Sequence, residues 1–397
     1  VETAGSIRRW RPTIGDVDVL AASEDGEAVV EAFADWDGAD SVIEAGANKA
    51  SIRADGERVD LRVVVPGEFG AALQYFTGSK AHNVALRNRA IERGLKVNEY
   101  GVFDVSGIDD PDAGQRVGER VAGGTEAGVY DAVGLEFVPP ELREDRGEIR
   151  AAADGALPEL IETADVRGDL HLHTTASDGT ATVEEMAAAA AEFGHEYLAI
   201  ADHATGPGMV GGVGLDDDEL LEHADAIRAV DDEVDIDVLA GVEANIGSEG
   251  SISVGEDVLE TLECVVASPH SGLDGDGTDR LVAAVEHPEV DVLGHPTGRL
   301  LNQRPGHDVD IERLAAAAAD AGTALEINAD PRRLDLRSSY VKAAVEAGAT
   351  IAVDTDAHGT GAYANVRFGV HTARRGWVEP ADVLNCRDAA GVREFLG

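Results

Sequence analysis

The stretch GDLHLHTTASDG, which starts at Gly168, places three side chains that can bind metal close together. His171, His173 and Asp178 fall within it, and the two histidines alternate with leucines. Alternate residues of an extended strand face the same side, so both imidazoles should point in one direction. Imidazole and carboxylate groups are typical ligands of Zn²⁺, Mn²⁺ and Fe²⁺. We therefore expect a metal site to begin here.

Further candidate ligands follow apolar runs downstream, each at the point where the run ends. They are His203 after EYLAIAD, Glu243 after DIDVLAGV, His270 after ECVVASP, His295 after VDVLG, and Asp356 and His358 in TIAVDTDAH. A closed zinc site takes four ligands, so nine side chains indicate two or three ions with open coordination positions. Such ions can activate water and clamp the oxygens of a phosphoryl group. The residues predict a multinuclear hydrolytic site that holds Mn²⁺ or Zn²⁺.

The same apolar runs predict the elements that position these ligands. Seven buried-strand candidates alternate with helical patterns such as TVEEMAAAAAEFG, which opens with a Thr182–Glu185 capping box and stops at Gly194. Strands that alternate with helices indicate a parallel sheet. Functional residues at the carboxyl ends of strands are typical of a barrel. We predict a seven-stranded β/α barrel over residues 168–397.

The order of HLHTTASDG, ADH, GVE, SPH, GHP and DTDAH resembles the PHP (polymerase and histidinol phosphatase) family. The resemblance implies a distorted (β/α)₇ barrel with a trinuclear metal site that cleaves phosphoesters. Arg299, in GHPTGR, is a candidate to pair with a substrate phosphate, and an ordinary surface ion pair is the alternative. We expect Asp202 and Asp354 to support the ligands beside them. The remaining histidines are expected to lie outside the site: His82, His195, His223, His287, His307 and His371.

A second set of carboxylates lies in the first part of the chain. Asp16 and Asp18 alternate in GDVDVL, and Asp60 lies in RVDLRV, on another predicted strand. Three carboxylates on one sheet face can hold two Mg²⁺ ions, which prefer oxygen ligands and substrate phosphates. Ser6 and Arg9 precede them, where a hydroxyl and a guanidinium could bind a triphosphate. Exposed carboxylates of an acidic protein are the alternative interpretation.

GS with the following GDVDVL, VDLRVV, and YFTGSKAHNVALRNRA resemble the palm and thumb of family X DNA polymerases, in the nucleotidyltransferase superfamily. By that resemblance Tyr75, Phe76 and Gly78 lie against the sugar of the incoming nucleotide, Asn83 lies near its base edge, and Arg87 lies near the template strand. A plain structural role in the core or on a solvated helix is the alternative for these residues.

Together these patterns predict an α/β and α+β multidomain chain. Its parts are a nucleotidyltransferase-like palm at 1–74, a thumb at 75–137, a helical linker at 138–167 and the PHP barrel at 168–397. This order resembles the PolX proteins, DNA polymerases with a built-in 3′–5′ exonuclease. The resemblance implies gapped or 3′-ended DNA and dNTPs as partners, with the barrel trimming 3′ ends before the palm fills a gap, as in base-excision repair. A small-molecule phosphoesterase such as a histidinol phosphatase and a non-catalytic DNA-binding remnant are the alternatives.

The net charge of the chain indicates the salt conditions in which the protein is expected to work. Asp and Glu number 77 against 32 Lys and Arg, a formal net charge of −45, and the carboxylates are spread along the whole sequence. Self-repulsion of this size is relieved by molar salt, which favours a salt-adapted protein of a halophile over a local acidic interaction surface. We expect weak DNA affinity, because the protein offers few cations to the phosphates.

The ends and the cysteines complete the sequence prediction. No apolar run reaches membrane-spanning length, and Cys264 and Cys386 form no CxxC pattern, so we expect a reduced cytoplasmic setting and no membrane partner. VETAGSIRRW reads as the middle of a domain. We therefore expect that an N-terminal DNA-binding region and fingers precede it.

Overall fold

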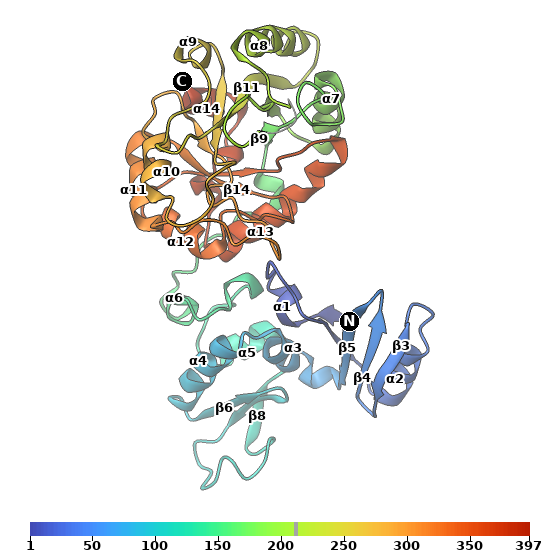
Figure 1. Cartoon of the computed structure of the whole chain (residues 1–397). Helices are drawn as coiled ribbons and strands as arrows, with labels where there is room; N and C mark the ends of the chain where they lie inside the picture. Colours follow the sequence, from blue (N-terminus) through green and yellow to red (C-terminus); the bar gives the residue numbers. More distant parts are fainter. Residues whose placement is uncertain (210–212) are drawn as a thin grey trace. The chain divides into compact units, whose positions relative to one another are not determined.

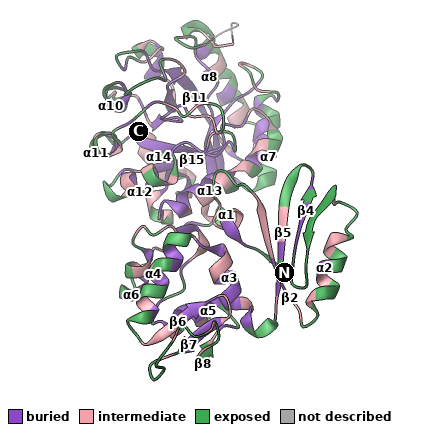
Figure 2. Cartoon of the chain, turned by 60° about the horizontal axis from the view of Figure 1, so that its bottom comes forward, coloured by how far each residue is buried: buried purple, intermediate pink, exposed green. Residues whose placement is uncertain are grey.

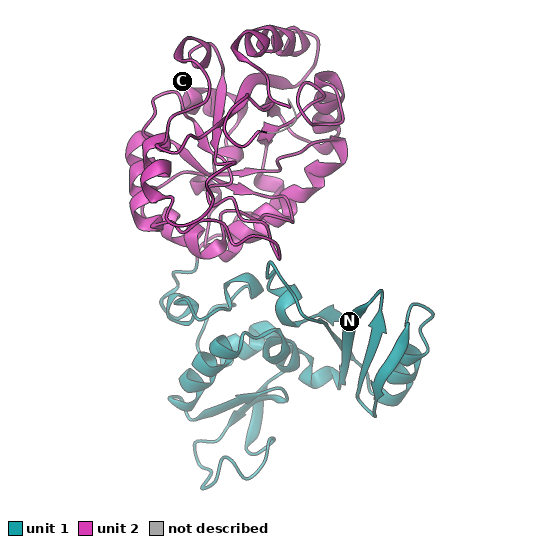
Figure 3. Cartoon of the chain, viewed as in Figure 1, with its two compact units in different colours: residues 1–157 teal, residues 158–397 magenta. Residues whose placement is uncertain are grey.

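The chain folds into two compact units, Val1–Leu157 and Pro158–Gly397 (Figure 3). The structure is a computed structural model and describes residues 1–209 and 213–397. Each unit has its own strands and its own buried clusters (Figures 1 and 2). Among the described residues, no helix combines the length and the apolar character needed to cross a lipid bilayer.

The first unit begins with a five-stranded mixed sheet of order β1-β2-β5-β4-β3. The strands are β1 (Glu2–Thr3), β2 (Val17–Ala22), β3 (Ser41–Ala45), β4 (Lys49–Ala54) and β5 (Glu57–Val64). Helix α2 (Gly26–Ala34) covers one face, where Val30 packs with Ala21, Leu61 and Val63. Asp18 and Asp60 lie directly opposite each other on the parallel pair β2 and β5. Because side chains alternate along a strand, these carboxylates lie on the face away from α2.

The rest of the first unit is mostly helical, with a small antiparallel sheet of order β6-β7-β8. Its elements are α3 (Phe69–Thr77), α4 (Lys80–Ile91), β6 (Leu95–Asn98), β7 (Gly101–Asp104), β8 (Glu119–Ala122), α5 (Glu126–Ala132) and α6 (Glu148–Asp154). Helix α1 (Gly5–Arg8) lies between β1 and β2 of the large sheet in the chain. Helix α6 lies within the segment predicted as a linker, and its buried Glu148 lies 2.7 Å from Nδ1 of His82 on α4. This contact joins α6 to the helical part of the first unit.

The second unit is a parallel sheet of seven strands in the order β15-β14-β13-β12-β11-β10-β9. They are β9 (Gly168–Leu172), β10 (Tyr197–Ile200), β11 (Asp237–Asn245), β12 (Cys264–Ser268), β13 (Val292–Leu293), β14 (Ala324–Asn328) and β15 (Ile351–Asp354). Leu172 forms a parallel bridge with Ala357, and the backbone N–H of His173 donates to the Ala357 carbonyl at 2.9 Å. The first and last strands therefore meet, which gives a nearly closed barrel. The predicted seven-stranded fold is confirmed.

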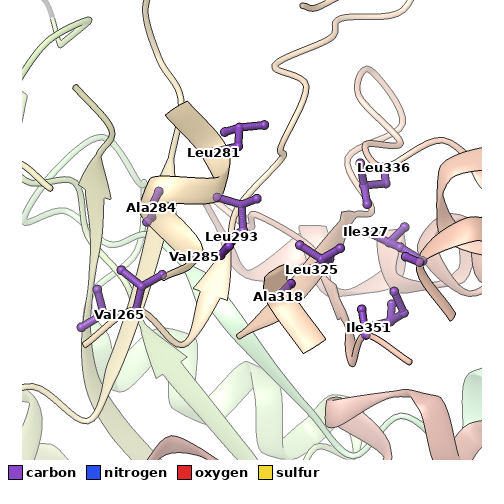
Figure 4. Close-up of a cluster of buried hydrophobic side chains, with 14 of the residues drawn as sticks. Val265, Leu281, Ala284, Val285, Leu293, Ala318, Leu325, Ile327, Leu336 and Ile351 are labelled. Carbon is purple, nitrogen blue, oxygen red and sulfur yellow. The ribbon is translucent and has the colours of Figure 1, made fainter. Parts of the chain in front are cut away.

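Helices that follow the strands cover the outside of the barrel (Figure 1). They are α7 (Val183–Phe193), α8 (Asp217–Asp231), α9 (Glu256–Leu259), α10 (Thr278–Val285), α11 (Ile311–Ala321), α12 (Ser338–Glu346) and α13 (Val366–Arg375). The last helix, α14 (Ala389–Leu396), packs with a separate cluster of strand residues that includes Leu170, Leu239 and Val292. Figure 4 shows part of the core, in which Leu293 and Leu325 of the strands lie among Leu281 and Ala318 of the helices. This packing fixes the carboxyl ends of the strands, where the candidate ligands lie.

A buried ion network holds the first unit together. The guanidinium of Arg143 is fully buried and donates to the Glu126 carboxylate at 2.7 Å and to the Val138 carbonyl at 2.9 Å. Arg8 donates to both oxygens of the same carboxylate, at 2.8 and 2.7 Å. These cations hold the pKa of Glu126 below its ordinary value, although burial alone would raise it. One carboxylate thus joins α1 to α5 and to the segment after it.

We expect Glu126→Gln to lower the free energy of unfolding of the first unit by about 3 kcal/mol, because it leaves the buried Arg143 charge without its counterion. Hydrogen exchange of the α5 amides measures this change locally. Glu119→Gln, at an exposed position of β8, removes the same charge and should leave the exchange rates unchanged. Equal protection in Glu126→Gln and in the unsubstituted chain would contradict this account of the network.

Candidate metal centre and polymerase-type site

The barrel centre is organised around Glu243, which lies on β11 and is fully buried. Five histidine rings surround its carboxylate. The Nε2 atoms of His171, His270 and His295 lie 3.3, 3.3 and 3.0 Å from Oε1, and His203 Nδ1 and His173 Nε2 lie 2.7 and 3.6 Å from Oε2. Burial alone would raise the pKa of Glu243, but the imidazoles hold it well below the ordinary value. The carboxylate is therefore charged.

Three overlapping groups of candidate ligands adjoin this carboxylate, each with its ligand atoms within 4.8 Å of one another. The groups are His173, Asp178, His203 and His358; His171, His173 and Asp356; and His203, Glu243 and His270. His173 and His203 each belong to two groups, so the groups form one continuous cluster. With His295 beside Glu243, the structure brings together all nine side chains singled out in the sequence.

The unpaired atoms of the cluster match what a cation requires. Several buried ring nitrogens lack a hydrogen bond: Nε2 of His171, both nitrogens of His173, Nδ1 of His203 and Nδ1 of His295. A buried polar atom without a partner costs about 1–3 kcal/mol. The presence of several such ring nitrogens in one place therefore needs an explanation. Divalent cations provide one, because neutral imidazole and carboxylate are their ligands. These residues could hold two or three such ions.

Side chains behind the ligands orient them. Glu326, on β14, lies 2.6 Å from Nδ1 of His171, and its burial raises its own pKa to about 7. Asn328 donates to Asp356 at 3.0 Å, and Asn245 lies 2.7 Å from Nδ1 of His270. Contacts of this kind fix which ring nitrogen faces the metal. The sequence analysis did not identify these three residues, although Glu326 and Asn328 alternate at the end of ALEIN as ligands do in DLHLH.

The two aspartates expected to support the ligands make many contacts. Asp202 accepts hydrogen bonds from the Thr174 backbone and hydroxyl at 2.8 and 2.7 Å, and it lies 2.8 Å from Nε2 of His223. Asp354 accepts from the Leu170 N–H and from Asn385, both at 2.8 Å. Both aspartates therefore tie together the loops and strands that carry the ligands.

Arg299 lies on the loop after β13, and its guanidinium is engaged by backbone. Its Nε donates to the Arg333 carbonyl at 2.9 Å, and one of its Nη atoms donates to the Leu334 carbonyl. The neighbouring Arg333 is the closer to the ligands, because its Nε lies 3.5 Å from Oδ2 of Asp356. The side chain of Arg299 therefore holds a loop in place. Its contact with a substrate phosphate stays a prediction.

The three carboxylates of the first unit also converge. Asp16 immediately precedes β2, Asp18 lies on it, and Asp60 faces Asp18 across the strand pair. Burial and the charges of Asp16 and Asp60 raise the pKa of Asp18. Gly5 has φ +62°, and a Cβ there would lie 1.9 Å from Asp18 Oδ2, so only glycine lets the backbone approach this carboxylate. Mutually repelling carboxylates are an arrangement that divalent cations stabilise.

A cavity of about 200 Å³ adjoins two of these carboxylates, Asp18 and Asp60. Arg58 donates to Asp60 at 2.9 Å, and Ser51 donates to the same oxygen. Phe76 of α3 also lines this cavity and lies under the Arg62 guanidinium, 4.6 Å from its Cζ. The helix that carries the predicted sugar contacts therefore reaches the carboxylate face.

The remaining predicted nucleotide contacts lie on neighbouring elements of the first unit. Ser6 is on α1, and Arg9 donates to Glu144 at 3.2 Å and to the Thr77 carbonyl. Gly78 ends α3 with φ +71°. Asn83 donates to the Tyr75 carbonyl at 2.8 Å, and the exposed Arg87 lies 5.8 Å from the Tyr75 ring. The structure thus gathers these residues around α1, α3 and α4.

Comparison with known proteins defines the class to which this chain belongs. Residues 72–144 match the model of the DNA polymerase beta thumb, and residues 169–291 match that of the PHP domain. The chain therefore joins a polymerase-beta-type thumb to a PHP barrel.

Its relatives identify the family. The chain is 38% identical, over 99% of its length and 68% of the relative, to a protein of Bacillus subtilis (strain 168) named DNA polymerase/3′-5′ exonuclease PolX. The chain belongs to the PolX family of DNA polymerases, which confirms the predicted resemblance. A probable phosphatase of Shewanella sp. (strain MR-4) is 33% identical over 48% of this chain and 75% of its own length.

Among solved structures, the chain is similar to Leishmania infantum polymerase beta. A ternary gap complex of that enzyme is 26% identical, with a TM-score of 0.30, over 36% of this chain and 61% of that one. A ternary P/T complex of the same enzyme is 27% identical, with a TM-score of 0.29, over 36% of this chain and 66% of that one.

We expect the purified chain to retain roughly two to three divalent ions in the barrel, and Glu243→Gln to lose most of them, because it removes the carboxylate shared by the imidazoles. Elemental analysis after exhaustive dialysis measures the content. His287→Ala changes a histidine that contacts Glu256 instead of the cluster and should keep the full content. Retention of all ions by Glu243→Gln would contradict the proposed centre.

Proposed function

We propose that the chain is a DNA repair polymerase that carries its own 3′–5′ exonuclease, with the two reactions assigned to different units. The observation that carries this proposal is the combination in one chain of a carboxylate trio on an open sheet face and a nine-ligand cluster in a PHP barrel. The relatives named as probable phosphatases cover about half of this chain, whereas the PolX relative covers nearly all of it. This difference favours the polymerase over a small-molecule phosphoesterase.

In the first unit, Asp16, Asp18 and Asp60 would hold two Mg²⁺ ions. Bound there, the ions supply charge neutralisation for the triphosphate and lower the pKa of the primer 3′-hydroxyl. Asp60 is assigned to the attacking hydroxyl. Ser6 and Arg9 would orient the triphosphate, and the other predicted contacts would hold the nucleotide and template: Tyr75, Phe76 and Gly78 at the sugar, Asn83 at the base edge and Arg87 at the template strand.

In the barrel, the nine ligands would hold two or three ions of Mn²⁺ or Zn²⁺. Such ions supply an activated water and neutralise a phosphodiester. Glu326 would accept a hydrogen bond from Nδ1–H of His171, which leaves Nε2 of that ring to face a cation. Water adds to the phosphorus, the bond to the 3′-oxygen breaks, and this leaving oxygen takes up a proton that the water gives up. The products are a nucleoside 5′-monophosphate and a strand with a new 3′-hydroxyl.

The two reactions act on the same DNA end in opposite directions. Removal of a mismatched nucleotide restores a 3′-hydroxyl, and this group is the nucleophile that the polymerase reaction requires. The substrates are then gapped or 3′-ended DNA and dNTPs, and the process suits gap filling in base-excision repair. The net charge of −45 supports a setting of high salt, in which counterion release contributes little to DNA binding.

We expect Asp60→Ala to reduce primer extension on a labelled gapped duplex by about 10³-fold, by removal of a metal ligand at the reacting end, and to leave primer shortening intact. His171→Ala/His173→Ala should show the reverse. Denaturing gels with Mn²⁺, with and without dNTPs, measure both reactions. Asp37→Ala, at an exposed position of the same unit, is the matched control. Full Mn²⁺-dependent shortening by the double histidine variant would contradict the assignment.

We expect the midpoint of thermal unfolding to rise by more than about 10 °C between 0.1 M and 2 M KCl, because salt screens the repulsion among the carboxylates. Calorimetry or circular dichroism measures the midpoint. A parallel series with sucrose at equal concentrations is the control, because sucrose is excluded from the protein surface but does not screen charges. A midpoint that is independent of KCl would contradict adaptation to salt.

A further inference from the structure

Two loops at the rim of the barrel carry a concentration of arginines in a chain that is otherwise strongly acidic. The loop after β13 spans residues 294–310, and the loop after β14 spans residues 329–337. Their arginines are Arg299, Arg304, Arg332, Arg333 and Arg337. We call these two segments the arginine loops. Both follow parallel strands, so they emerge at the same rim as the ligands His295 and Asp356.

The arginine loops border two cavities that lead away from the metal ligands. One, of about 440 Å³, is lined by Arg332 together with the ligands Asp356 and His358. The other, of about 430 Å³, is lined by residues 299–305 and by Arg337. Residues 330–332 line the first cavity and Arg337 lines the second, and Arg333 lies between them in the chain with its Nε 3.5 Å from Asp356. A row of cations therefore starts at the metal centre and continues outward.

The arginine loops are held rigidly by contacts with each other. The buried carboxylate of Asp335 accepts from the Thr297 hydroxyl at 2.8 Å and from the Thr297 N–H at 3.0 Å. The Leu301 N–H donates to the Arg332 carbonyl at 2.6 Å, and Arg299 donates to the carbonyls of the opposite loop. The guanidinium groups are thus positioned before any ligand arrives, which reduces the entropy lost on binding.

The arginine loops hold five arginines against four aspartates, Asp308, Asp310, Asp330 and Asp335, so they carry a small positive charge within an acidic chain. Burial and the charge of Arg333 lower the pKa of Arg304. Burial likewise lowers the pKa of Arg299, and the charge of Arg337 adds to that effect. Arg304 uses its Nε for the Gly298 carbonyl at 2.8 Å, and Arg337 lies over the Tyr340 ring at 3.8 Å. Cations held together against their own repulsion favour a polyanionic partner.

We propose that the arginine loops form a binding surface for single-stranded DNA that delivers its 3′ end to the metal centre. This inference rests on the proposed exonuclease function and adds the path of the substrate strand. The terminal phosphodiester lies at the cavity beside Asp356, and the phosphates upstream of it contact Arg304 and Arg337. Guanidinium groups bind phosphate with two parallel hydrogen bonds, and Tyr340 offers a ring beside Arg337. A paired end must open by a few nucleotides to follow this path.

The test compares two double variants that each remove two positive charges from the barrel. Arg304→Ala/Arg337→Ala alters the arginine loops. Arg228→Ala/Arg393→Ala is the matched control, since these arginines contact Thr261 and Glu263, just before β12 and therefore at the opposite end of the barrel. The substrates are a fluorescent single-stranded oligonucleotide and the small diester thymidine 5′-p-nitrophenyl phosphate, over a series of KCl concentrations.

For Arg304→Ala/Arg337→Ala we expect kcat/KM on the oligonucleotide to fall at least about 10-fold. The slope of log affinity against log salt should become shallower by about 1.4, or roughly 0.7 for each lost phosphate contact. Hydrolysis of the small diester and the metal content should stay unchanged. Arg337→Ala alone, at an exposed side chain, should change the slope by about half as much. The control variant should match the unsubstituted chain.

Three results would overturn the proposed surface. They are an unchanged salt slope in Arg304→Ala/Arg337→Ala, an equal loss in the control variant, and a parallel loss of activity on the small diester. Failure of the exonuclease assignment is recognised separately, because the unsubstituted chain would then leave the oligonucleotide uncut, whether or not it cleaves the small diester. Fluorescence anisotropy of the bound oligonucleotide, which needs no cleavage, would still decide whether the arginine loops hold the strand.

Discussion

The burial of one carboxylate among five imidazoles is the constraint on which the barrel unit depends. Glu243 has no exposed surface, and its oxygens face ring nitrogens of five histidines from four different segments of the chain. An isolated buried charge costs several kcal/mol, so this group is tolerated only where compensating charge surrounds it. Metal ions held among these donors would provide that charge and link the strand ends. The proposed metal centre thus follows from the burial of Glu243 at the rim of the nearly closed barrel.

The first unit also holds carboxylates close together, but in a more open setting. Asp18 and Asp60 face each other on parallel strands, and burial together with the charges of Asp16 and Asp60 raises the pKa of Asp18. Here the surroundings are a sheet face with a cavity beside it, so ions can enter together with a nucleotide. Oxygen ligands alone suit Mg²⁺, whereas the imidazoles of the barrel suit softer ions. The donor chemistry thus separates two phosphoryl reactions within one chain.

Much of the barrel could be predicted from the sequence because its signals are local. Each ligand ends an apolar run, and parallel strands bring such ends to one rim, so His171 and Asp356 could be placed together although they lie far apart in the chain. Glu326 was missed although it alternates with Asn328 at the end of ALEIN, because its role depends on a contact with His171 that forms only in the folded barrel. The environment of Arg299 is set by the carbonyls of the next loop, and the contact between His82 and Glu148 on α6 depends likewise on tertiary packing.

X-ray diffraction from crystals grown with Mn²⁺, recorded on both sides of its absorption edge, tests the central claim most directly. We predict anomalous peaks at ligand distance from Glu243 and from at least one histidine of each group, with the imidazole rings close to their present positions. Anomalous peaks only at other carboxylates of this acidic chain, or a barrel that stays intact with Glu243 in contact with no ion, would contradict the account.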